Sequence, residues 1–327
     1  MRVLVITELD SEKPRLNIST LDKLLLTVKI ARPRTWMFAV VSYLYAYLES
    51  NSPIMWQVAV GIVIFSVLTG ATNMINAYTD MPEDQINNPI RLKWINQLGV
   101  RNLIRSTFIV YSSVILLSLP FGPVFTLVVI VAVFDSIFYS LPPIRFKRHP
   151  VTALISFSGA VGLPFFAGLV ASNRLNLMDP WFILFTLFML TYGTIKNVPD
   201  FLGDQLAGLK TTVTAFEDFK EAVKVSSMLL ILPYLLLVFF VGMGILSKMY
   251  LLNILLMAFP VYWAYRNLRT NNREGLEKLH TQGFIYAISF YLFNFILSQS
   301  SPVSLVITFS VMLTIFMLTN LRIDSRI

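Results

Sequence analysis

The chain of 327 residues is 56% hydrophobic and only 13% charged, with a mean hydropathy of +0.68, which excludes an ordinary water-soluble domain. Cysteine is absent and His149 and His280 are the only histidines, which excludes disulfides and thiolate metal sites and argues against a histidine-rich metal site. We expect the net charge of +8 to come from loops that face an anionic membrane surface, and we expect no nucleic-acid partner.

The first 30 residues are polar and mixed in charge, and they lack the apolar core and cleavage site of a secretory signal peptide. We expect residues 1–30 to form a cytoplasmic or interfacial tail with a weak amphipathic pattern. Residues 31–321 are predicted to form a single membrane domain, and residues 322–327 a short cytoplasmic tail.

The membrane domain contains ten apolar segments, and a spanning helix needs about 20 mostly apolar residues. The first and third segments are short, and only Ser300, Ser301 and Pro302 separate the last two, which is compatible with a hairpin. The sequence therefore predicts an all-α, multi-span membrane protein with nine or ten transmembrane helices in a single bundle around a central cavity open to the cytoplasmic side. The segments are 35–49, 55–79, 102–118, 122–140, 151–172, 179–199, 221–246, 249–266, 281–298 and 302–321.

The basic residues predict the orientation of the bundle. Of the 26 lysines and arginines, only Arg174 and Lys248 fall in connections that this topology places outside the cell. Positive charge marks cytoplasmic loops, so we expect an even number of spans and both termini inside. Function is carried by loops on a rigid scaffold, and the long polar connections all fall on the cytoplasmic side. These connections are 80–101, 141–150, 200–220 and 267–280.

Two acidic stretches end apolar segments in the two halves of the chain. The first is Asn76-Ala-Tyr-Thr-Asp80-Met-Pro-Glu-Asp84, and the second is Lys196-Asn197-Val-Pro-Asp200-Phe-Leu-Gly-Asp204. Carboxylates beside a membrane are costly unless something binds there. Residues four apart share a helix face, so each stretch is predicted to present a polar stripe. A proline in each, Pro82 and Pro199, predicts that the helix breaks at the site, which is tolerated where backbone lines a polar cavity.

The aspartates of the two stripes suit a divalent cation. Carboxylates this close repel one another and would shift toward protonation, unless a cation lies between them. Mg²⁺ prefers oxygen ligands and commonly bridges carboxylates to substrate phosphates. Two facing stripes would therefore hold Mg²⁺ and clamp a diphosphate. The predicted metal ligands, which are also catalytic residues, are Asp80, Asp84, Asp200 and Asp204.

A diphosphate also needs positive partners, and arginine and lysine both grip phosphate. For each basic residue the alternative is a loop charge that only anchors the topology. Arg148, Lys93 and Arg101 are assigned to that alternative. The predicted diphosphate-binding cations are Arg91, Arg145, Lys147 and Lys196.

These motifs resemble the UbiA superfamily of intramembrane prenyltransferases, from about residue 30 to about residue 300. The family's Asn-x3-Asp-x3-Asp motif is matched by Asn76, Asp80 and Asp84. Its second Asp-x3-Asp motif is matched by Asp200 and Asp204. The remaining matches are the Tyr-Ser-x-x-Pro segment at Tyr139, Ser140 and Pro143, and the Gly-x-x-Thr segment at Gly208 and Thr211.

The resemblance implies that Mg²⁺ and basic residues help a prenyl diphosphate to ionise, and that a lipophilic, often aromatic, acceptor captures the allylic cation. It also implies donor-binding roles for Asn76 and Asn197, and a catalytic role for Tyr139 beside the cation. The chain departs from the pattern after Arg91, where the Arg-Pro pair of many members is missing, and at Asn197, where many members have aspartate. The residues that would bind the prenyl diphosphate donor are thus better supported than those that would bind the acceptor.

Asp135 lies inside a predicted span, one turn before Tyr139. An acid within the membrane is a functional candidate, so Asp135 is included among the predicted substrate-binding residues. The alternative is a structural hydrogen bond to a neighbouring helix. The aromatic residues Tyr78, Phe138 and Tyr192 near the same end are more typical of packing than of cation stabilisation.

Two other functions are compatible with parts of the pattern. A membrane terpene cyclase would use the same metal site without an acceptor, and the missing acceptor-side signature keeps that alternative open. A transporter would place its acids near the membrane midplane in inverted repeats, whereas here the acidic stretches lie at one face. We therefore favour the transferase.

Overall fold

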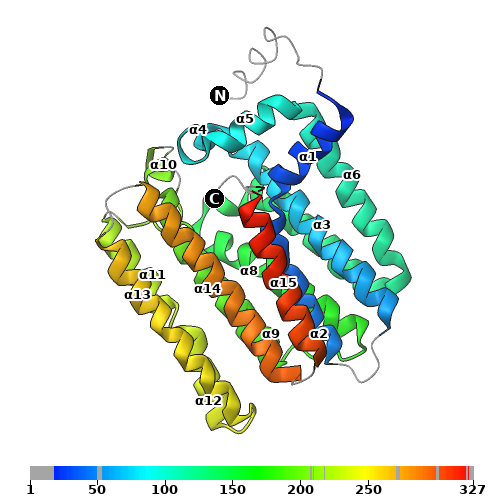
Figure 1. The fold of residues 1–327 in the computed structure, drawn as a ribbon, viewed down its shortest axis with the longest axis vertical. Coiled ribbons are helices and arrows are strands. Elements are labelled where there is room, and N and C mark those ends of the chain that lie inside the picture. The colour runs from blue at the N-terminus through cyan, green and yellow to red at the C-terminus, as the bar shows by residue number, and fades with distance from the viewer. Residues whose placement is uncertain are drawn as a thin grey trace.

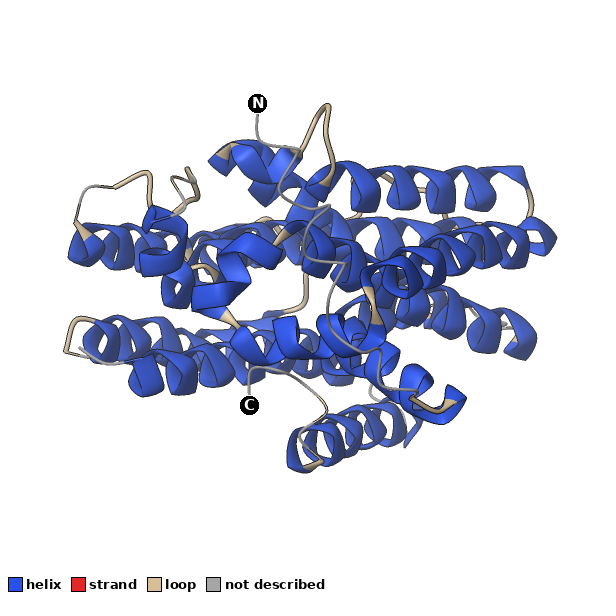
Figure 2. Ribbon diagram, turned by 90° about the horizontal axis from the view of Figure 1, so that it is seen from above, coloured by secondary structure: helices blue, strands red, loops and turns tan. Residues whose placement is uncertain are grey.

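The computed structural model describes residues 18–49, 54–206, 208, 210–216, 218–269, 273–299, 302–321 and 323. Within these ranges the regular elements are helices, connected by loops and short 3₁₀ turns (Figures 1 and 2). Most of the predicted tails 1–30 and 322–327 lies outside the described residues, apart from α1. The α-helices are α1 (Thr20–Ala31), α2 (Trp36–Leu48), α3 (Met55–Thr79), α4 (Met81–Asn87), α5 (Pro89–Leu98), α6 (Val100–Ser118), α7 (Pro123–Ser140), α8 (Pro150–Ala171), α9 (Pro180–Lys196), α10 (Phe201–Leu206), α11 (Phe219–Leu229), α12 (Leu232–Gly242), α13 (Ala258–Asn267), α14 (Arg273–Gln299) and α15 (Pro302–Asn320).

Eight stretches of helix in the described part of the chain are long and apolar enough to span a membrane. They correspond to all the predicted spans except 35–49 and 249–266. The first of these is the short helix α2, which follows the 3₁₀ turn η1 (Pro33–Thr35), and the second combines the 3₁₀ helix η5 (Lys248–Met257) with α13. The protein is thus an all-helical, multi-span membrane bundle. The last two predicted spans form two separate helices, α14 and α15, which pack together as a hairpin would.

Proline and side-chain caps start many of the helices. Proline occupies the first turn of α4, α5, α7, α8 and α9, where its missing N–H costs no hydrogen bond. At α9, Asp179 also accepts from the backbone N–H groups of Trp181 and Phe182, at 2.8 and 3.1 Å. These local signals position the helix that leads to the second acidic stretch.

Helix α2 lies in the core of the bundle despite its short length. Every residue from Phe38 to Tyr47 is buried, and α2 packs closely against α8 and α3. A Cβ atom added to Gly168 of α8 would lie 2.6 Å from the backbone oxygen of Tyr43, so glycine is what allows the two backbones to approach. The Ser42 hydroxyl donates to the backbone oxygen of Val161 at 2.8 Å, a contact typical of helices that pack within a membrane.

The outer helices expose apolar side chains. Leu235, Val238 and Phe239 of α12 are each at least 42% exposed, and Phe309 and Phe316 of α15 at least 66%. Broad exposed apolar surface on many helices is expected where the surrounding solvent is lipid.

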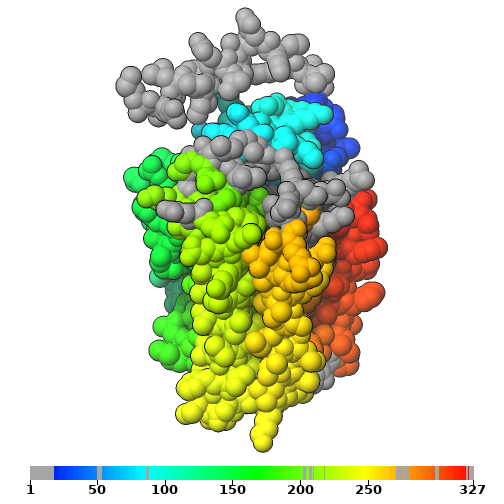
Figure 3. All heavy atoms as spheres, turned by 90° about the vertical axis from the view of Figure 1, so that its left-hand side faces the viewer, coloured from blue at the N-terminus to red at the C-terminus, as the bar shows by residue number. Residues whose placement is uncertain are grey.

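One end of the bundle carries a cap of short helices. Figure 1 shows α1, α4, α5 and α10 at the same end, and Figure 3 shows the cyan and blue segments covering that end. A separate apolar cluster joins α1, α3, α5 and α6 there through Ile30, Met74, Ile95 and Leu103. Both acidic stretches therefore lie at the capped end, which matches their predicted placement on one side of the bundle.

Candidate active site

The first acidic stretch lies where α3 ends and α4 begins. Asp80 lies between the two helices with φ −93° and ψ 5°, and Pro82 stands in the first turn of α4. The helical hydrogen bonds nevertheless continue, since the Asp80 N–H donates to the Asn76 oxygen at 2.9 Å and the Asp84 N–H to the Asp80 oxygen at 2.8 Å. The break thus changes the helix direction while the four-residue spacing persists.

The second acidic stretch has a similar break. Helix α9 ends at Lys196, the 3₁₀ turn η4 (Val198–Asp200) follows, and α10 carries Asp204. The Asn197 amide donates to the Thr212 hydroxyl at 3.1 Å, which ties the stretch to the loop after it. Helix α10 packs against α4. The two stretches, which come from opposite halves of the chain, therefore meet at the capped end.

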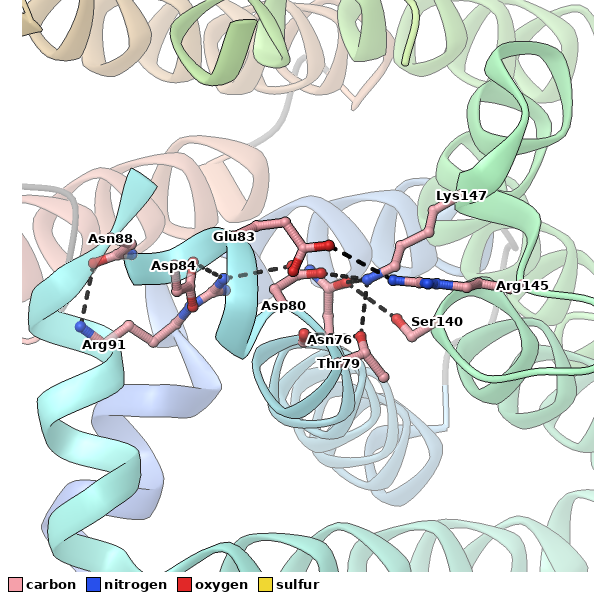
Figure 4. Close-up of polar contacts among 10 residues, drawn as sticks. All are labelled: Asn76, Thr79, Asp80, Glu83, Asp84, Asn88, Arg91, Ser140, Arg145 and Lys147. Carbon is pink, nitrogen blue, oxygen red and sulfur yellow. Dashed lines mark hydrogen bonds and ion pairs between the residues drawn. The ribbon is translucent and has the colours of Figure 1, made fainter. Parts of the chain in front are cut away.

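Three acidic residues of the first stretch pair with three basic residues (Figure 4). Lys147 donates to Asp80. Arg91 donates to both oxygens of Asp84, through Nη2 at 2.6 Å and through Nε, and its Nη2 also lies 3.4 Å from Asp80 Oδ2. The third pair is looser, because the Arg145 Nη2 lies 3.7 Å from the Glu83 Oε1.

Lys147 also joins the loop between α7 and α8 to the end of α3. Its Nζ donates to the Thr79 hydroxyl at 2.8 Å and to the Asn76 side-chain oxygen at 3.4 Å. The Ser140 hydroxyl at the end of α7 donates to the same Asn76 oxygen at 3.1 Å. Asn76 is therefore an acceptor that holds two segments in place beside Asp80.

The cations decide the charge state of Asp80, which lies just beyond the membrane span of α3. Burial by itself raises the pKa of the Asp80 carboxyl, but the positive charges of Lys147, Arg91 and Lys196 outweigh burial and leave the pKa below its ordinary value. Basic side chains thus already keep this carboxylate ionised.

Lys196 and Tyr139 connect the two halves of the site. Lys196 belongs to the second stretch, yet its charge acts on Asp80 of the first, and its Nζ lies 4.5 Å from the centre of the Phe157 ring. The charges of Asp80, Asp200 and Asp204, and also that of Asp135, act on Tyr139 at the end of α7.

Asp135 lies inside the span of α7, one turn before Tyr139, and its charge acts on that tyrosine. Its carboxyl faces α8, since its Oδ2 would lie 3.4 Å from a Cβ atom built on Gly159. Its role in substrate binding stays a prediction.

Several residues of the site were not predicted from the sequence. The buried Glu83, the Thr79 hydroxyl, the Phe157 ring and Thr212 were not included among the candidates. Glu83 had a signal, because it lies seven residues after Asn76 and so on the same helix face. Phe157 and Thr212 come from distant segments, and spacing along the chain gives no signal for them.

The donor atoms at this end suit a hard cation and an anion together. The carboxylate oxygens are of the type that Mg²⁺ prefers, and the lysine and arginine groups are of the type that binds phosphate. In the present arrangement no three His, Asp or Glu side chains among the described residues are placed to hold a metal ion. The residues therefore fit Mg²⁺ in chemistry, with the first-stretch carboxylates engaged by basic side chains.

A model of the UbiA prenyltransferase family matches residues 35–291 of the chain. A 2-acylphloroglucinol 4-prenyltransferase of Humulus lupulus is 26% identical over 236 residues, which are 67% of this chain and 56% of that protein. A digeranylgeranylglyceryl phosphate synthase of Methanothrix thermoacetophila is 25% identical over 221 residues, which are 67% of this chain and 80% of that protein. The chain spans about half the length of the first two curated relatives, which are 56% and 42% covered.

Solved structures show the same fold. A UbiA homologue of Archaeoglobus fulgidus bound to GPP and Mg²⁺ aligns with a TM-score of 0.62 at 19% identity, over 81% of this chain and 99% of that chain. The apo structure of a UbiA homologue of Aeropyrum pernix aligns with a TM-score of 0.57 at 14% identity, over 80% of this chain and 98% of that chain.

Proposed function

Because the chain belongs to the UbiA prenyltransferase family, we propose that it is a Mg²⁺-dependent intramembrane prenyltransferase. It ionises a prenyl diphosphate, transfers the isoprenyl group to a lipophilic, aromatic acceptor, and releases diphosphate. The observation that carries this proposal is the meeting of α4 and α10, which brings two acidic stretches and their basic partners to one end of a membrane bundle. We assign the catalytic domain to residues 31–321 and its open end to the cytoplasm.

The donor's diphosphate head would lie between the two stretches. Asp80, Asp84, Asp200 and Asp204 would hold Mg²⁺, which supplies positive charge to the leaving diphosphate. Arginine binds phosphate through a planar fork, and lysine binds it as a point charge. Those side chains would stabilise the charge that develops as the C–O bond breaks. The cations in these roles are Arg91, Arg145, Lys147 and Lys196.

Asn76 and Asn197 have a positioning role in this proposal. Asn76 accepts from Lys147 and Ser140, and Asn197 donates to Thr212. These bonds hold the ends of α3 and α9, from which the two stretches start. Preorganised groups lower a barrier more than groups that must move during the reaction.

Tyr139 provides the aromatic face nearest the reacting carbon in this proposal. The bond from that carbon to oxygen breaks, its electrons leave with the diphosphate, and the allylic cation remains. An aromatic ring stabilises a cation by about 0.5–2 kcal/mol. An acceptor carbon then forms the new bond and loses a proton.

The similar proteins support this choice of substrate class. GPP and DMAPP are bound with Mg²⁺ in the Archaeoglobus homologue, and the curated relatives of Humulus and Arabidopsis are named prenyltransferases and a homogentisate solanesyltransferase. By extension, we propose donors of this diphosphate type and an acceptor with an electron-rich ring.

The experiment incubates the purified protein with Mg²⁺, a panel of prenyl diphosphates of different chain length, and a phenolic acceptor, and identifies products by mass spectrometry. We expect a prenylated acceptor and free diphosphate, and no turnover when Mg²⁺ is chelated. A cyclic hydrocarbon or alcohol formed without any acceptor would instead establish the cyclase alternative. Transport of the donor without diphosphate release would rule out both enzymes.

A further inference from the structure

Helix α1 carries apolar side chains on two opposite faces. On one face, Leu26 and Ile30 pack into the apolar cluster that joins α1 to α3, α5 and α6. On the other, Leu21, Leu24 and Leu25 follow one another at the spacing of a single helix face, and they are 74%, 61% and 47% exposed. The packed face holds α1 on the cap, whereas the leucine face remains uncovered by the described part of the chain.

The contacts of α1 place it at the level of a membrane boundary. Leu103 of α6 belongs to the same apolar cluster as Ile30, and it lies in the first turn of a helical stretch, Val100–Phe121, that is long and apolar enough to span a membrane. Figure 1 shows α1 running across α3 and α6 rather than along them. A helix that crosses the spans at the depth where one of them begins has the position of an interfacial helix, whose apolar face enters the boundary between headgroups and acyl chains.

The same turns of α6 present positive charge on their outer side. Arg101 and Arg105 are exposed and lie one turn apart, and neither takes part in an ion pair with another described residue. Phe108 and Leu116 continue the same helix face and are 46% and 65% exposed. Along the helix this face changes from charged to apolar, as a phospholipid does from its phosphate to its acyl chains.

We propose that the leucine face of α1 and the outer face of α6 form a docking surface for anionic phospholipids. Leu21, Leu24 and Leu25 lie in the acyl boundary, and Arg101 and Arg105 hold lipid phosphates, which arginine binds through a planar fork. Each basic side chain near a membrane surface favours an anionic lipid by roughly fivefold, so charge selects the kind of lipid at this surface. The docking fixes the cap of the bundle to the membrane and does not depend on the proposed reaction.

The depth of α1 is measured on single-cysteine variants of the full chain, because the sequence has no cysteine of its own. Leu24→Cys and Gln97→Cys are spin-labelled and reconstituted into mixed bilayers of phosphatidylglycerol and phosphatidylcholine. Gln97 is an exposed polar residue of α5 in the same cap and serves as the control. Electron paramagnetic resonance compares the collisions of each label with oxygen and with a water-soluble nickel chelate.

We expect the label at position 24 to lie about 5–10 Å below the lipid phosphates and the label at position 97 to lie in water. A label at position 24 that collides mainly with the nickel chelate overturns the inference. A label there that is shielded from both reagents also overturns it, because protein, either the residues before α1 or a second copy of the chain, then covers the leucines.

The lipid preference is measured at Ser112→Cys, because Ser112 is exposed on the α6 face that begins with Arg101 and Arg105. A fluorescent label at this position is quenched by brominated phosphatidylglycerol or by brominated phosphatidylcholine. We expect phosphatidylglycerol to be favoured by roughly fivefold for each arginine, and the preference to disappear when Arg101→Gln and Arg105→Gln are combined.

The matched control combines Lys220→Gln with Lys224→Gln, which removes two exposed charges one turn apart on α11 and should leave the preference at position 112 unchanged. If the double arginine variant does not fold, Arg105→Gln alone should lower the preference by roughly fivefold. Equal quenching by the two lipids before any arginine is replaced overturns the inference. The same preference in the arginine variants and in the lysine control overturns it as well.

Discussion

Two hydrogen-bonded pairs inside the bundle differ in charge from the side chains at its capped end. Inside, Asn253 and Asn294 exchange two hydrogen bonds at 2.8 and 3.0 Å, and the hydroxyls of Tyr234 and Tyr286 lie 2.7 Å apart. At the capped end the groups are charged, and two buried atoms of the Glu83–Arg145 pair have no hydrogen-bond partner.

This difference distinguishes polar side chains that only join helices from polar side chains that can bind a ligand. A closed, neutral pair joins two helices and has no remaining capacity for a ligand. A charged cluster with unused donors and acceptors is costly by itself, because an unsatisfied buried group costs about 1–3 kcal/mol. Such a cost is offset when a ligand completes the cluster. We therefore expect substitutions inside to change stability, and substitutions at the capped end to change activity.

The largest effect is expected at the centre of the charged cluster. Asp80→Asn removes a proposed metal ligand and should lower kcat/KM for the prenyl diphosphate by about a thousandfold. Diphosphate release measured at several Mg²⁺ concentrations checks this. Glu221→Gln, at an exposed acid of α11, is the control for loss of a negative charge. Near-normal turnover in Asp80→Asn would contradict the expectation that substitutions at the capped end change activity.

The next effect is expected inside the bundle. Asn294→Leu leaves the buried amide of Asn253 without its partner, so the free energy of unfolding should fall by about 1–3 kcal/mol. The melting temperature in detergent measures this, and activity per folded molecule should be retained. The double variant with Asn253→Leu should recover part of the loss, because both polar groups are then removed. A specific loss of kcat with unchanged melting would count against a structural role.

A smaller effect is expected at the boundary between the bundle interior and its capped end. Ser140→Ala removes one of two donors to Asn76. Loss of a hydrogen bond worth about 0.5–1.5 kcal/mol should lower kcat/KM by roughly threefold to tenfold. Steady-state kinetics with the prenyl diphosphate tests this, with Ser113→Ala on the exposed face of α6 as control. An effect as large as that of Asp80→Asn would show that Ser140 contacts the substrate itself.

The smallest effect is expected at the interior tyrosines. Tyr286→Phe leaves the ring stacked on Phe259 at 4.3 Å and removes only the hydroxyl, so the free energy of unfolding should fall by about 1 kcal/mol. Thermal melting should detect a shift of a few degrees, and kinetics should show none. A change in the chain length of the preferred donor would instead place Tyr286 at the prenyl tail.

Much of the fold could be predicted because its causes are local. Hydropathy over a window located the spans, and the prolines located the helix breaks at Asp80 and before Asp200. The family resemblance was confirmed by the match over residues 35–291. The predicted spans 35–49 and 249–266 were harder to read. Helix α2 in the first is short and is stabilised by its close contact with α8, and the second combines η5 with α13.

The candidate site was predictable in its residue types and less so in its contacts. The four-residue spacing identified Asn76, Asp80 and Asp84, which the structure keeps together. The same reasoning could not identify the partner of each carboxylate. Glu83 lies on the same helix face as Asn76 but outside the four-residue spacing of the aspartates. The approach of Asp135 to Gly159 arises only from the packing of α7 on α8.

The membrane bundle and the two acidic stretches at helix ends follow from the sequence, because hydropathy, charge and helical spacing act over short distances along the chain. Three features come from the packing of the helices: α4 meets α10, Lys147 and Arg91 pair with the carboxylates of Asp80 and Asp84, and Glu83 and Arg145 keep buried atoms without hydrogen bonds. Those contacts join segments far apart in the sequence, and their strength depends on burial, which no local pattern specifies.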